Sequence, residues 1–510
     1  MYRAVSYRGS EMLARASGLL AVVGVLLSCA APQPVEQANG RAGARPNVIV
    51  IIADDLGYGD TSAYGSPIIR TPNLDAMAAD GVRFTRGYVS HPVCAPSRAA
   101  LLTGRYQERF GYEFNPVGRD REGGVAITET MSPALMKQAG YATGMVGKWH
   151  LGRSQGFHPL DRGFDEYFGI LAGASSFMLD IKDGDDAYVP PGSEYSTRAP
   201  GNFDESVSLT PVEEMRQMRA RSPVSRGREV VDEPAYLTEA FTREAVDFIG
   251  RHKSEPFFLY LAYNAPHTPL QATKKYLDRY RHVEDRGQRI YAAMVSAMDD
   301  GIGDLRRKLE AEGIARNTLI IFLSDNGCAG YVLGACTNFP LSGFKGEHLE
   351  GGVRVPYIIS WPGTIPSGKV DDRIVSSLDI LPTALTVAGA QPPANLDGQN
   401  MMQLFAANAQ PAPRQLYWRA GPTKAVIDGS SKLWISETQE PDGKAGTHTM
   451  LFNLASDPTE SRNIAAQNPA EAQRLGKLFD AWSATMSAPQ WPSMRQAVRT
   501  YDGKQLKVYN

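Results

Sequence analysis

Two pairs of oxygen-bearing residues directly follow continuous apolar runs. Asp54 and Asp55 end "PNVIVIIADD" at residues 46–55, and Asp325 and Asn326 lie near the end of "NTLIIFLSDNG" at 317–327. Carboxylate and amide oxygens suit a hard divalent cation, calcium or magnesium, better than zinc. A single acid after a strand often only caps the next helix, but two such pairs are harder to explain in that way. The sequence therefore predicts a metal site built from these four residues.

Basic side chains in other segments could neutralise a small anion beside that cation. They are Lys148 and His150 in "GYATGMVGKWHLG", His267 in "NAPHTP", Lys345 in "FKGEHLEGGVRVP", and Arg98. Singly, each has an ordinary explanation as an exposed lysine, a hydrogen-bonded core histidine or an arginine paired with an acid. Together they match the needs of phosphate or sulfate ester hydrolysis, because charge on the non-bridging and leaving oxygens must be neutralised.

Cys94 lies in "HPVCAPSRAALLTG" at residues 91–104 and has three ordinary interpretations: a half-cystine, a thiol nucleophile or a metal ligand. The chain has 4 cysteines, and Cys328 and Cys336 are close enough in sequence to pair in an oxidising compartment. Because Cys29 lies in the N-terminal apolar segment, that pairing leaves Cys94 alone. The composition by itself does not decide among its chemical roles.

The elements that must position these residues can be read from the hydrophobic pattern. The runs at 46–55, 256–267, 317–327 and 355–363 lack polar alternation, as buried strands of a parallel sheet do. Helical spacing of apolar residues appears at 236–250 and again from 290 to 309. Strands alternating with helices predict a doubly wound α/β fold, whose ligands bind at the carboxyl edge of the sheet. Short strand-like pieces after residue 410, followed by a helical segment at 469–484, predict a small antiparallel sheet with a helix.

The N-terminus has the form of a secretory signal. Arg3, Arg8 and Arg15 precede the short apolar run of residues 18–29. That run ends in Leu-Leu-Ser-Cys29, which resembles a bacterial lipobox; ordinary cleavage near Ala30 or Ala31 is the alternative. We therefore divide the chain into a signal peptide at 1–29, a linker at 30–45, a catalytic domain at 46–410 and a small α+β subdomain at 411–510. The expected location is the periplasm, or the outer membrane through a lipid anchor, of a Gram-negative bacterium.

The net charge points to no broad class of charged partner. The 53 basic and 55 acidic residues nearly cancel, giving a formal charge of −2. Nothing in this balance favours nucleic-acid binding, so anion binding must come from a local site.

Two long motifs resemble those of a known family. Cys94-x-Pro-Ser-Arg98, followed by "LLTG" at 101–104, resembles the signature of the type I, formylglycine-dependent sulfatases of the alkaline phosphatase-like superfamily. The segment "GYATGMVGKWH" is similar to that family's second signature. The resemblance extends in order from about residue 46 to "LFNLASDPTESRN" near the C-terminus. It implies an alkaline phosphatase-like sandwich: a large, mostly parallel sheet flanked by helices, with a small C-terminal antiparallel sheet and helix.

The resemblance also implies a role for each candidate residue. Cys94 would be oxidised to formylglycine by a maturation enzyme, and one hydroxyl of the hydrated aldehyde would attack sulfur. One calcium ion would be held by five residues: Asp54, Asp55, residue 94, Asp325 and Asn326. Arg98 and Lys148 would steady the formylglycine and the metal site, and His150 would take the diol proton during sulfate release. Lys345 and His267 would hold the sulfate and the leaving oxygen, with His267 as the proton donor.

The substrate is expected to be a sulfated polysaccharide or oligosaccharide. An arginine cluster, Arg216, Arg219, Arg221, Arg226 and Arg228, could contact further sulfates, although such a run is usually a solvated face. The stretch "GRYQERFGYEFNP" at 104–116 resembles sulfatases of algal glycans such as carrageenan. Two alternatives stay open: a phosphate or phosphonate ester hydrolase of the same superfamily, and a lipoprotein that binds sulfated glycan without turnover.

Overall fold

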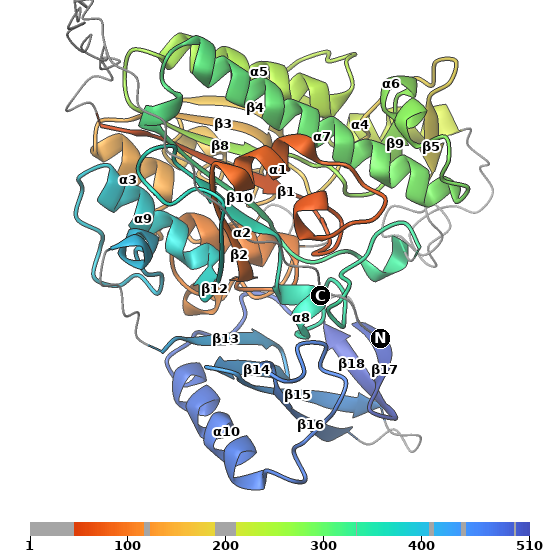
Figure 1. The fold of residues 1–510 in the computed structure, drawn as a ribbon, viewed down its shortest axis with the longest axis vertical. Helices are drawn as coiled ribbons and strands as arrows, with labels where there is room; N and C mark the ends of the chain where they lie inside the picture. The colour runs from red at the N-terminus through yellow and green to blue at the C-terminus, as the bar shows by residue number, and fades with distance from the viewer. Residues whose placement is uncertain are drawn as a thin grey trace, which may run out of the picture. The chain divides into compact units, whose positions relative to one another are not determined.

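The apolar runs of the sequence form neighbouring strands in the middle of one large sheet (Figure 1). The computed structural model describes residues 45–116, 123–188, 211–332, 334–406, 413–439, 445–493 and 496–509. Strand β1 (Asn47–Ala53) pairs in parallel with β10 (Thr318–Ser324) on one side and β8 (Phe257–Ala262) on the other. All residues of these three strands are buried, as expected for strands covered on both faces.

The sheet has 10 strands in the order β12-β2-β11-β10-β1-β8-β3-β4-β6-β7. Strands β3 (Ala142–Lys148) and β4 (Glu166–Ile170) continue its parallel part beyond β8. On the other side β11 (Tyr357–Ser360) runs antiparallel to both β10 and β2 (Gly81–Tyr88), and β12 (Lys369–Ser376) is parallel to β2. The short strands β6 (Val224–Arg226) and β7 (Glu229–Val230) close the far edge. The predicted mostly parallel sheet is confirmed.

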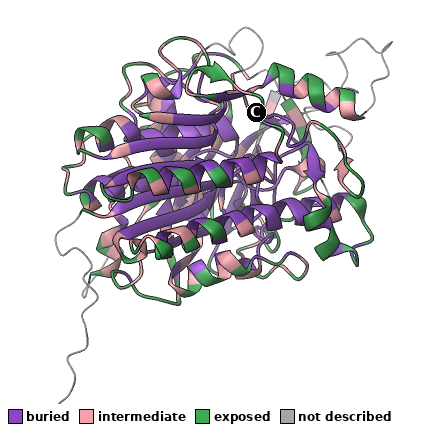
Figure 2. Cartoon of the chain, turned by 90° about the horizontal axis from the view of Figure 1, so that it is seen from above, coloured by how far each residue is buried: buried purple, intermediate pink, exposed green. Residues whose placement is uncertain are grey.

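Helices cover both faces of this sheet, and Figure 2 shows the buried strands lying between them. One face packs against α1 (Pro72–Ala79), α5 (Leu237–His252) and α7 (Arg286–Ala311) through the side chains of Ile49 and Ile51. The other face packs against α2 (Cys94–Thr103), α3 (Ser132–Gln138) and α9 (Ile380–Val387) through Val48, Val50 and Ile52. The alternation of β1 side chains between two apolar cores fixes the strand's register against its neighbours.

The C-terminal pieces form a second, antiparallel sheet, as predicted. Its strands are β13 (Gln415–Ala420), β14 (Thr423–Asp428), β15 (Ser431–Gln439), β16 (Ala445–Asn453), β17 (Gln496–Tyr501) and β18 (Lys504–Tyr509). The predicted helix is α10 (Pro469–Ser483), which packs on this sheet through Leu475 and Phe479. The hairpin of β17 and β18 adds a pair of strands that the sequence pattern did not indicate.

Shorter elements surround the carboxyl edge of the large sheet. Strand β5 (Asp186–Tyr188) pairs with β9 (Leu270–Ala272), and short helices occur at α4 (Pro211–Arg221), α6 (Lys274–Leu277) and α8 (Glu350–Val353). The two sheets belong to one compact unit, and residues 407–412, where we placed the domain boundary, lie outside the described residues. The signal peptide at 1–29 and nearly all of the linker lie outside them too. Among the described helices, none has the length and apolar composition that crossing a bilayer requires.

Candidate active site

The ends of β1 and β10 bring the predicted metal ligands together. Ala53 lies opposite Ser324 in the parallel register, so Asp54 and Asp55 emerge beside Asp325 and Asn326. The backbone N–H of Asp55 donates to Asp325 Oδ1 at 3.2 Å, and Asn326 Nδ2 donates to Asp55 Oδ1 at 2.7 Å. Asp55 has a φ of 64°, a left-handed conformation that non-glycine residues adopt infrequently. This local turn at the strand end places its carboxylate among the others.

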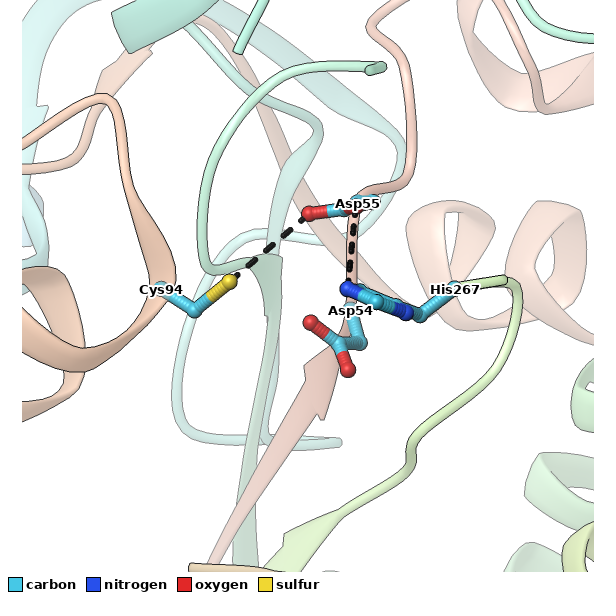
Figure 3. Close-up of side chains that lie close together, drawn as sticks. All are labelled: Asp54, Asp55, Cys94 and His267. Atoms are coloured by element: carbon cyan, nitrogen blue, oxygen red, sulfur yellow. Dashed lines mark hydrogen bonds and ion pairs between the residues drawn. The ribbon is translucent and has the colours of Figure 1, made fainter. Parts of the chain in front are cut away.

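Cys94 is the first residue of α2 and faces this group of acids (Figure 3). Its Sγ lies 3.9 Å from Asp55 Oδ1, and the residue is buried. Cys328 and Cys336 form a disulfide as predicted, and Cys94 is a free cysteine, so the half-cystine interpretation is wrong. Burial raises the pKa of the Cys94 thiol far above its usual range, more than the nearby Lys148 and Lys345 lower it, which disfavours a thiolate nucleophile.

Three cations contact the acids from three different elements. Lys148, the last residue of β3, places its Nζ 2.7 Å and 2.9 Å from the carboxylate oxygens of Asp54. Arg98, within the second turn of α2, donates from Nε to Asp325 Oδ2 at 2.8 Å. Lys345 Nζ lies 2.9 Å from the carboxylate of Asp55. Each of these three cations therefore faces a predicted metal ligand.

The two predicted histidines lie on loops that follow strands. His267 follows β8, and its Nε2 lies 3.5 Å from Asp55 Oδ2 and 3.5 Å from Lys345 Nζ. Its Nδ1 lies 2.7 Å from the carbonyl oxygen of Thr268, to which it donates. His150 lies two residues beyond β3 with a φ of 60° and is half-buried. A Cβ atom at position 173 would lie 2.6 Å from His150 Nε2, so Gly173 makes room for the imidazole.

Burial and neighbouring charges act in opposite directions on these groups. Burial raises the pKa of Asp54, but Lys148, His267 and Arg98 outweigh this effect, so the net pKa lies below its usual value. For Asp325, burial dominates over Arg98, and its pKa is raised. Burial lowers the pKa of His267, but the carboxylates of Asp55 and Asp54 reverse this effect and raise it.

The donor set fits a hard divalent cation. Ligand atoms of Asp54, Asp55, Cys94 and His267 all lie within 4.8 Å of one another, and all four residues are buried. Among the described residues, Oδ1 of Asn326 has no hydrogen-bond partner although it is buried beside these carboxylates. An unpartnered buried carbonyl next to carboxylates is what a calcium or magnesium ligand set requires.

Comparison with known proteins identifies the family to which this site belongs. The family model described as Sulfatase matches residues 46–390. The chain belongs to the sulfatase family. N-acetylgalactosamine-6-sulfatase of Mus musculus is 34% identical over 477 residues, which cover 85% of this chain and 83% of that protein. Steryl-sulfatase of Homo sapiens is 32% identical over 525 residues, which cover 88% of each. The protein is thus a sulfuric ester hydrolase.

Solved structures confirm the alkaline phosphatase-like fold of this sulfatase. Ps i-CgsB, solved in complex with k-i-k-neocarrahexaose, is 36% identical with a TM-score of 0.75, over 88% of this chain and 95% of that one. PsFucS1 sulfatase from Pseudoalteromonas sp. is 26% identical with a TM-score of 0.71, over 88% and 91%. Phosphonate monoester hydrolase of Agrobacterium radiobacter, 19% identical with a TM-score of 0.59 over 91% and 100%, shares the fold.

The structure corrects the expectation for the arginine cluster of this sulfatase. The guanidinium of Arg219 is buried and donates to the carbonyl oxygens of Ser176 and Glu233. Arg226 and Arg228 are exposed but form ion pairs with carboxylates of Glu244 and Asp161. Arg216, also exposed, donates from Nε to the carbonyl oxygen of Leu179 at 3.3 Å. Sequence spacing cannot show these partners, because they lie in segments remote from the cluster or in its surrounding loops. Arg221 is exposed and donates from Nε to the carbonyl oxygen of Gln217 at 3.3 Å. The five arginines therefore do not form a row of unpaired cations for a polyanion.

The sequence interpretation missed a residue that contacts the candidate site of this sulfatase. Tyr331 lies on a 3₁₀ turn, Gly330–Val332, and its hydroxyl donates to Asp55 Oδ2 at 3.4 Å. The available signal was its position between Cys328 and Cys336, since a disulfide that closes a loop just after two predicted metal ligands restricts where that loop can lie.

Proposed function

We propose that this protein is an exported, calcium-dependent sulfatase that hydrolyses sulfate monoesters of a sulfated oligosaccharide or polysaccharide, with residue 94 matured to formylglycine. The observation that carries the proposal is the position of Cys94. It is a buried, free thiol at the start of α2, 3.9 Å from a carboxylate of the predicted metal site. As formylglycine hydrate, residue 94 would supply one hydroxyl to attack sulfur and a second to release sulfate.

The metal would be held by Asp54, Asp55, Asp325 and Asn326 together with residue 94. Bound calcium would supply positive charge that polarises the nucleophile and the sulfate oxygens. Lys148 and Arg98 keep the carboxylates of Asp54 and Asp325 in place through contacts of 2.7 Å and 2.8 Å. Because these cations are buried with the acids, the set stays close to charge balance when an anionic substrate enters.

Lys345 and His267 are placed to act on the sulfate ester itself. Both contact Asp55, and their nitrogen atoms lie 3.5 Å apart, so they face the same small volume. Donation from Nδ1 to Thr268 directs Nε2 of His267 toward the site. Because Nε2 faces the site, a protonated His267 would be placed to donate to the leaving oxygen. His150, beyond β3, would accept the proton of residue 94 during sulfate release.

The glycan substrate is supported by the relatives rather than by this chain's own surface. Ps i-CgsB binds k-i-k-neocarrahexaose, and another relative is named for N-acetylgalactosamine 6-sulfate chemistry. Both observations favour a sulfated sugar over a small aryl sulfate. Assays of sulfate release from carrageenan and galactosamine-sulfate oligosaccharides, with a phosphonate and a phosphate monoester alongside, would distinguish these substrate classes. Faster turnover of a phosphorus ester would contradict the proposal.

Export and maturation complete the proposal. Residues 1–29 would direct the chain to the periplasm or to an outer-membrane lipid anchor, and a formylglycine-generating enzyme would oxidise Cys94. Peptide mass spectrometry of the exported protein tests both steps, because it reports the mature N-terminus and the state of residue 94.

The direct mutational test is Cys94→Ala. We expect it to abolish sulfate release while leaving the unfolding temperature close to that of the wild type, because the side chain removed is small and makes only a long contact to Asp55. Val370→Ala, an exposed side chain of β12 outside the site, is the control for general effects on folding. Substantial turnover by protein with alanine at position 94 would refute the formylglycine assignment.

A further inference from the structure

One connecting segment, residues 328–345, which we call the excursion, brings two side chains to the same carboxylate. It begins two residues after the metal-ligand candidate Asn326 and ends at Lys345. Tyr331 reaches Asp55 Oδ2 at 3.4 Å, and Lys345 Nζ reaches the Asp55 carboxylate at 2.9 Å. The position of this excursion therefore affects both a metal ligand and the cation assigned to the sulfate.

The disulfide is tied directly to Lys345. Cys328 and Cys336, eight residues apart, close the first half of the excursion, and both are buried. The backbone N–H of Lys345 donates to the carbonyl oxygen of Cys328 at 2.9 Å. Because one end of the cross-link holds the backbone of Lys345, the direction of its ammonium group depends on the closed loop.

Two buried polar residues brace the rest of the excursion. Asn338 accepts from the backbone N–H of Cys328 at 2.9 Å and donates to the carbonyl oxygen of Gly343 at 2.9 Å, so it bridges the two halves. Asp60 accepts from the backbone N–H of Thr337 at 2.9 Å and from the hydroxyl of Tyr291 at 2.7 Å. Loss of the disulfide would remove the covalent part of this bracing.

We propose that the loop closed by Cys328 and Cys336 is a positioning device for the active site, which sets Lys345 for the sulfate and uses the Tyr331 hydroxyl to orient Asp55 for the metal. This inference rests on the proposed function, since it assigns sulfate binding to Lys345. Both residues are positioning or binding groups, and neither reacts covalently. The disulfide thus acts on catalysis beyond its effect on stability.

The first test replaces the disulfide by Cys328→Ser with Cys336→Ser in formylglycine-bearing protein. At temperatures where the variant is folded, we expect the inhibition constant of inorganic sulfate to rise about tenfold, equivalent to about 1.4 kcal/mol. We expect kcat/KM to fall by at least the same factor. Phe339→Ala is the control, because that side chain belongs to the same excursion but is 74% exposed. A lower unfolding temperature with unchanged sulfate inhibition would overturn the proposal, since it would mark the disulfide as structural only.

A second background tests whether the loop acts through Lys345. In Lys345→Ala protein, opening the disulfide should change sulfate inhibition less than twofold, because the group that it positions is already gone. Equal losses in both backgrounds would contradict the proposal. Should the serine variant fail to fold, a dithiol can open the same bond in folded wild-type protein. The dithiol is then oxidised to a disulfide as the two cysteine thiols form, and reoxidation should restore sulfate inhibition.

Tyr331→Phe tests the metal side without using turnover. Removing a hydroxyl that contacts a metal ligand should raise the calcium concentration for half-maximal thermal stabilisation about tenfold. An unchanged calcium midpoint would overturn the role of Tyr331. Because this readout needs no activity, it separates the two hypotheses: wild-type protein without sulfate release would refute the proposed function, whereas active wild type with indifferent loop variants would refute only this inference.

Discussion

The charged residues of the candidate active site are buried together and depend on one another. Arg98 is fully buried, with its guanidinium 2.8 Å from Asp325 and 3.6 Å from Asp54. Lys148, also fully buried, contacts Asp54 at 2.7 Å. Taking such groups out of water is costly, and only the mutual contacts offset that cost. Removal of one of these charged side chains therefore leaves its partner buried with an uncompensated charge.

Asp325→Ala tests this dependence at the residue scale. The variant leaves Arg98 without its nearest carboxylate and removes one candidate calcium ligand, so we expect unfolding free energy to fall by about 3–5 kcal/mol. Urea unfolding with and without calcium measures both effects, and the stabilisation by calcium should shrink. Asp372→Ala, an exposed acid of β12, is the matched control. Equal unfolding free energies of the Asp325 and Asp372 variants would show that the ion pair of Arg98 with Asp325 does not stabilise the site.

At the scale of elements, the sequence predicted the strands and helices that a local hydrophobic pattern can specify. The runs ending at Asp55 and Asn326 became buried parallel strands because β-branched residues without polar alternation need cover on both faces. Their adjacency followed from the rule that ligands gather at the carboxyl edge. The antiparallel direction of β11, the pairing of β5 with β9 and the burial of Arg219 were not predicted. Each depends on a partner distant in sequence, which periodicity does not specify.

The end of β3 depends on close backbone approach. Gly147 has a φ of 111°, and a Cβ there would lie 1.9 Å from the carbonyl oxygen of Ala262 on β8. On the other side, Gly147 lies opposite Gly169 of β4. Because Lys148 follows immediately, the small residue lets this strand hold the ammonium group against Asp54.

Gly147→Ala should therefore disturb both the strand and the site. We expect a loss of at least about 2 kcal/mol in unfolding free energy, because the side chain is incompatible with both φ and space. We also expect kcat/KM to fall more than tenfold, since Lys148 must shift with the backbone. Gly476→Ala in α10 is the control, because its nearest neighbour would lie 4.0 Å away and alanine favours a helix. Wild-type kinetics in the Gly147 variant would contradict this account of β3.

At the scale of the whole molecule, two buried histidines connect the segments that carry Cys94 and Lys345. His91 and His348 are both buried, with ring centroids 6.2 Å apart. Burial lowers the pKa of His91 to about 3, and burial together with His91 and Lys432 lowers that of His348 well below its usual value. Both are neutral in the folded protein at pH values where an unfolded chain begins to protonate them, at about 6.5.

This difference predicts a loss of stability in acid. Between pH 6.5 and about 3 the unfolded chain binds a proton that His91 in the folded protein does not, so the unfolding free energy falls as the pH falls. His91→Gln removes one titrating group, so wild type should lose stability faster than the variant, by up to about 1.4 kcal/mol per pH unit. Denaturant unfolding from pH 7.5 to 4.5 measures the slopes. The exposed His282→Gln should follow wild type, and parallel curves for all three proteins would contradict the assignment.

The two sheets are joined by a buried ionic triad. Lys432 of β15 places its Nζ 2.9 Å from Glu350, at the start of α8, and 2.8 Å from Glu460. All three side chains are buried, and Glu460 also accepts from the backbone N–H of Glu350 at 2.6 Å. Because α8 lies five residues after Lys345, the C-terminal sheet braces the segment that carries the sulfate-binding candidate.

Lys432→Met tests this connection. The change leaves the buried carboxylate of Glu460 without a cation and leaves Glu350 with only Arg354, 3.3 Å away, so we expect a loss of about 3–5 kcal/mol in unfolding free energy. Lys424→Met is the matched control on the same sheet: its ion pair with Asp480 is largely exposed and should contribute about 1 kcal/mol or less. Adding Glu460→Gln to Lys432→Met should recover most of the stability, because Glu350 keeps Arg354 as a cation at 3.3 Å and the hydrogen bond from the Glu350 N–H keeps an acceptor. Additive losses in the double variant, measured by urea unfolding, would show that Lys432 and Glu460 stabilise the two sheets independently rather than as a coupled pair.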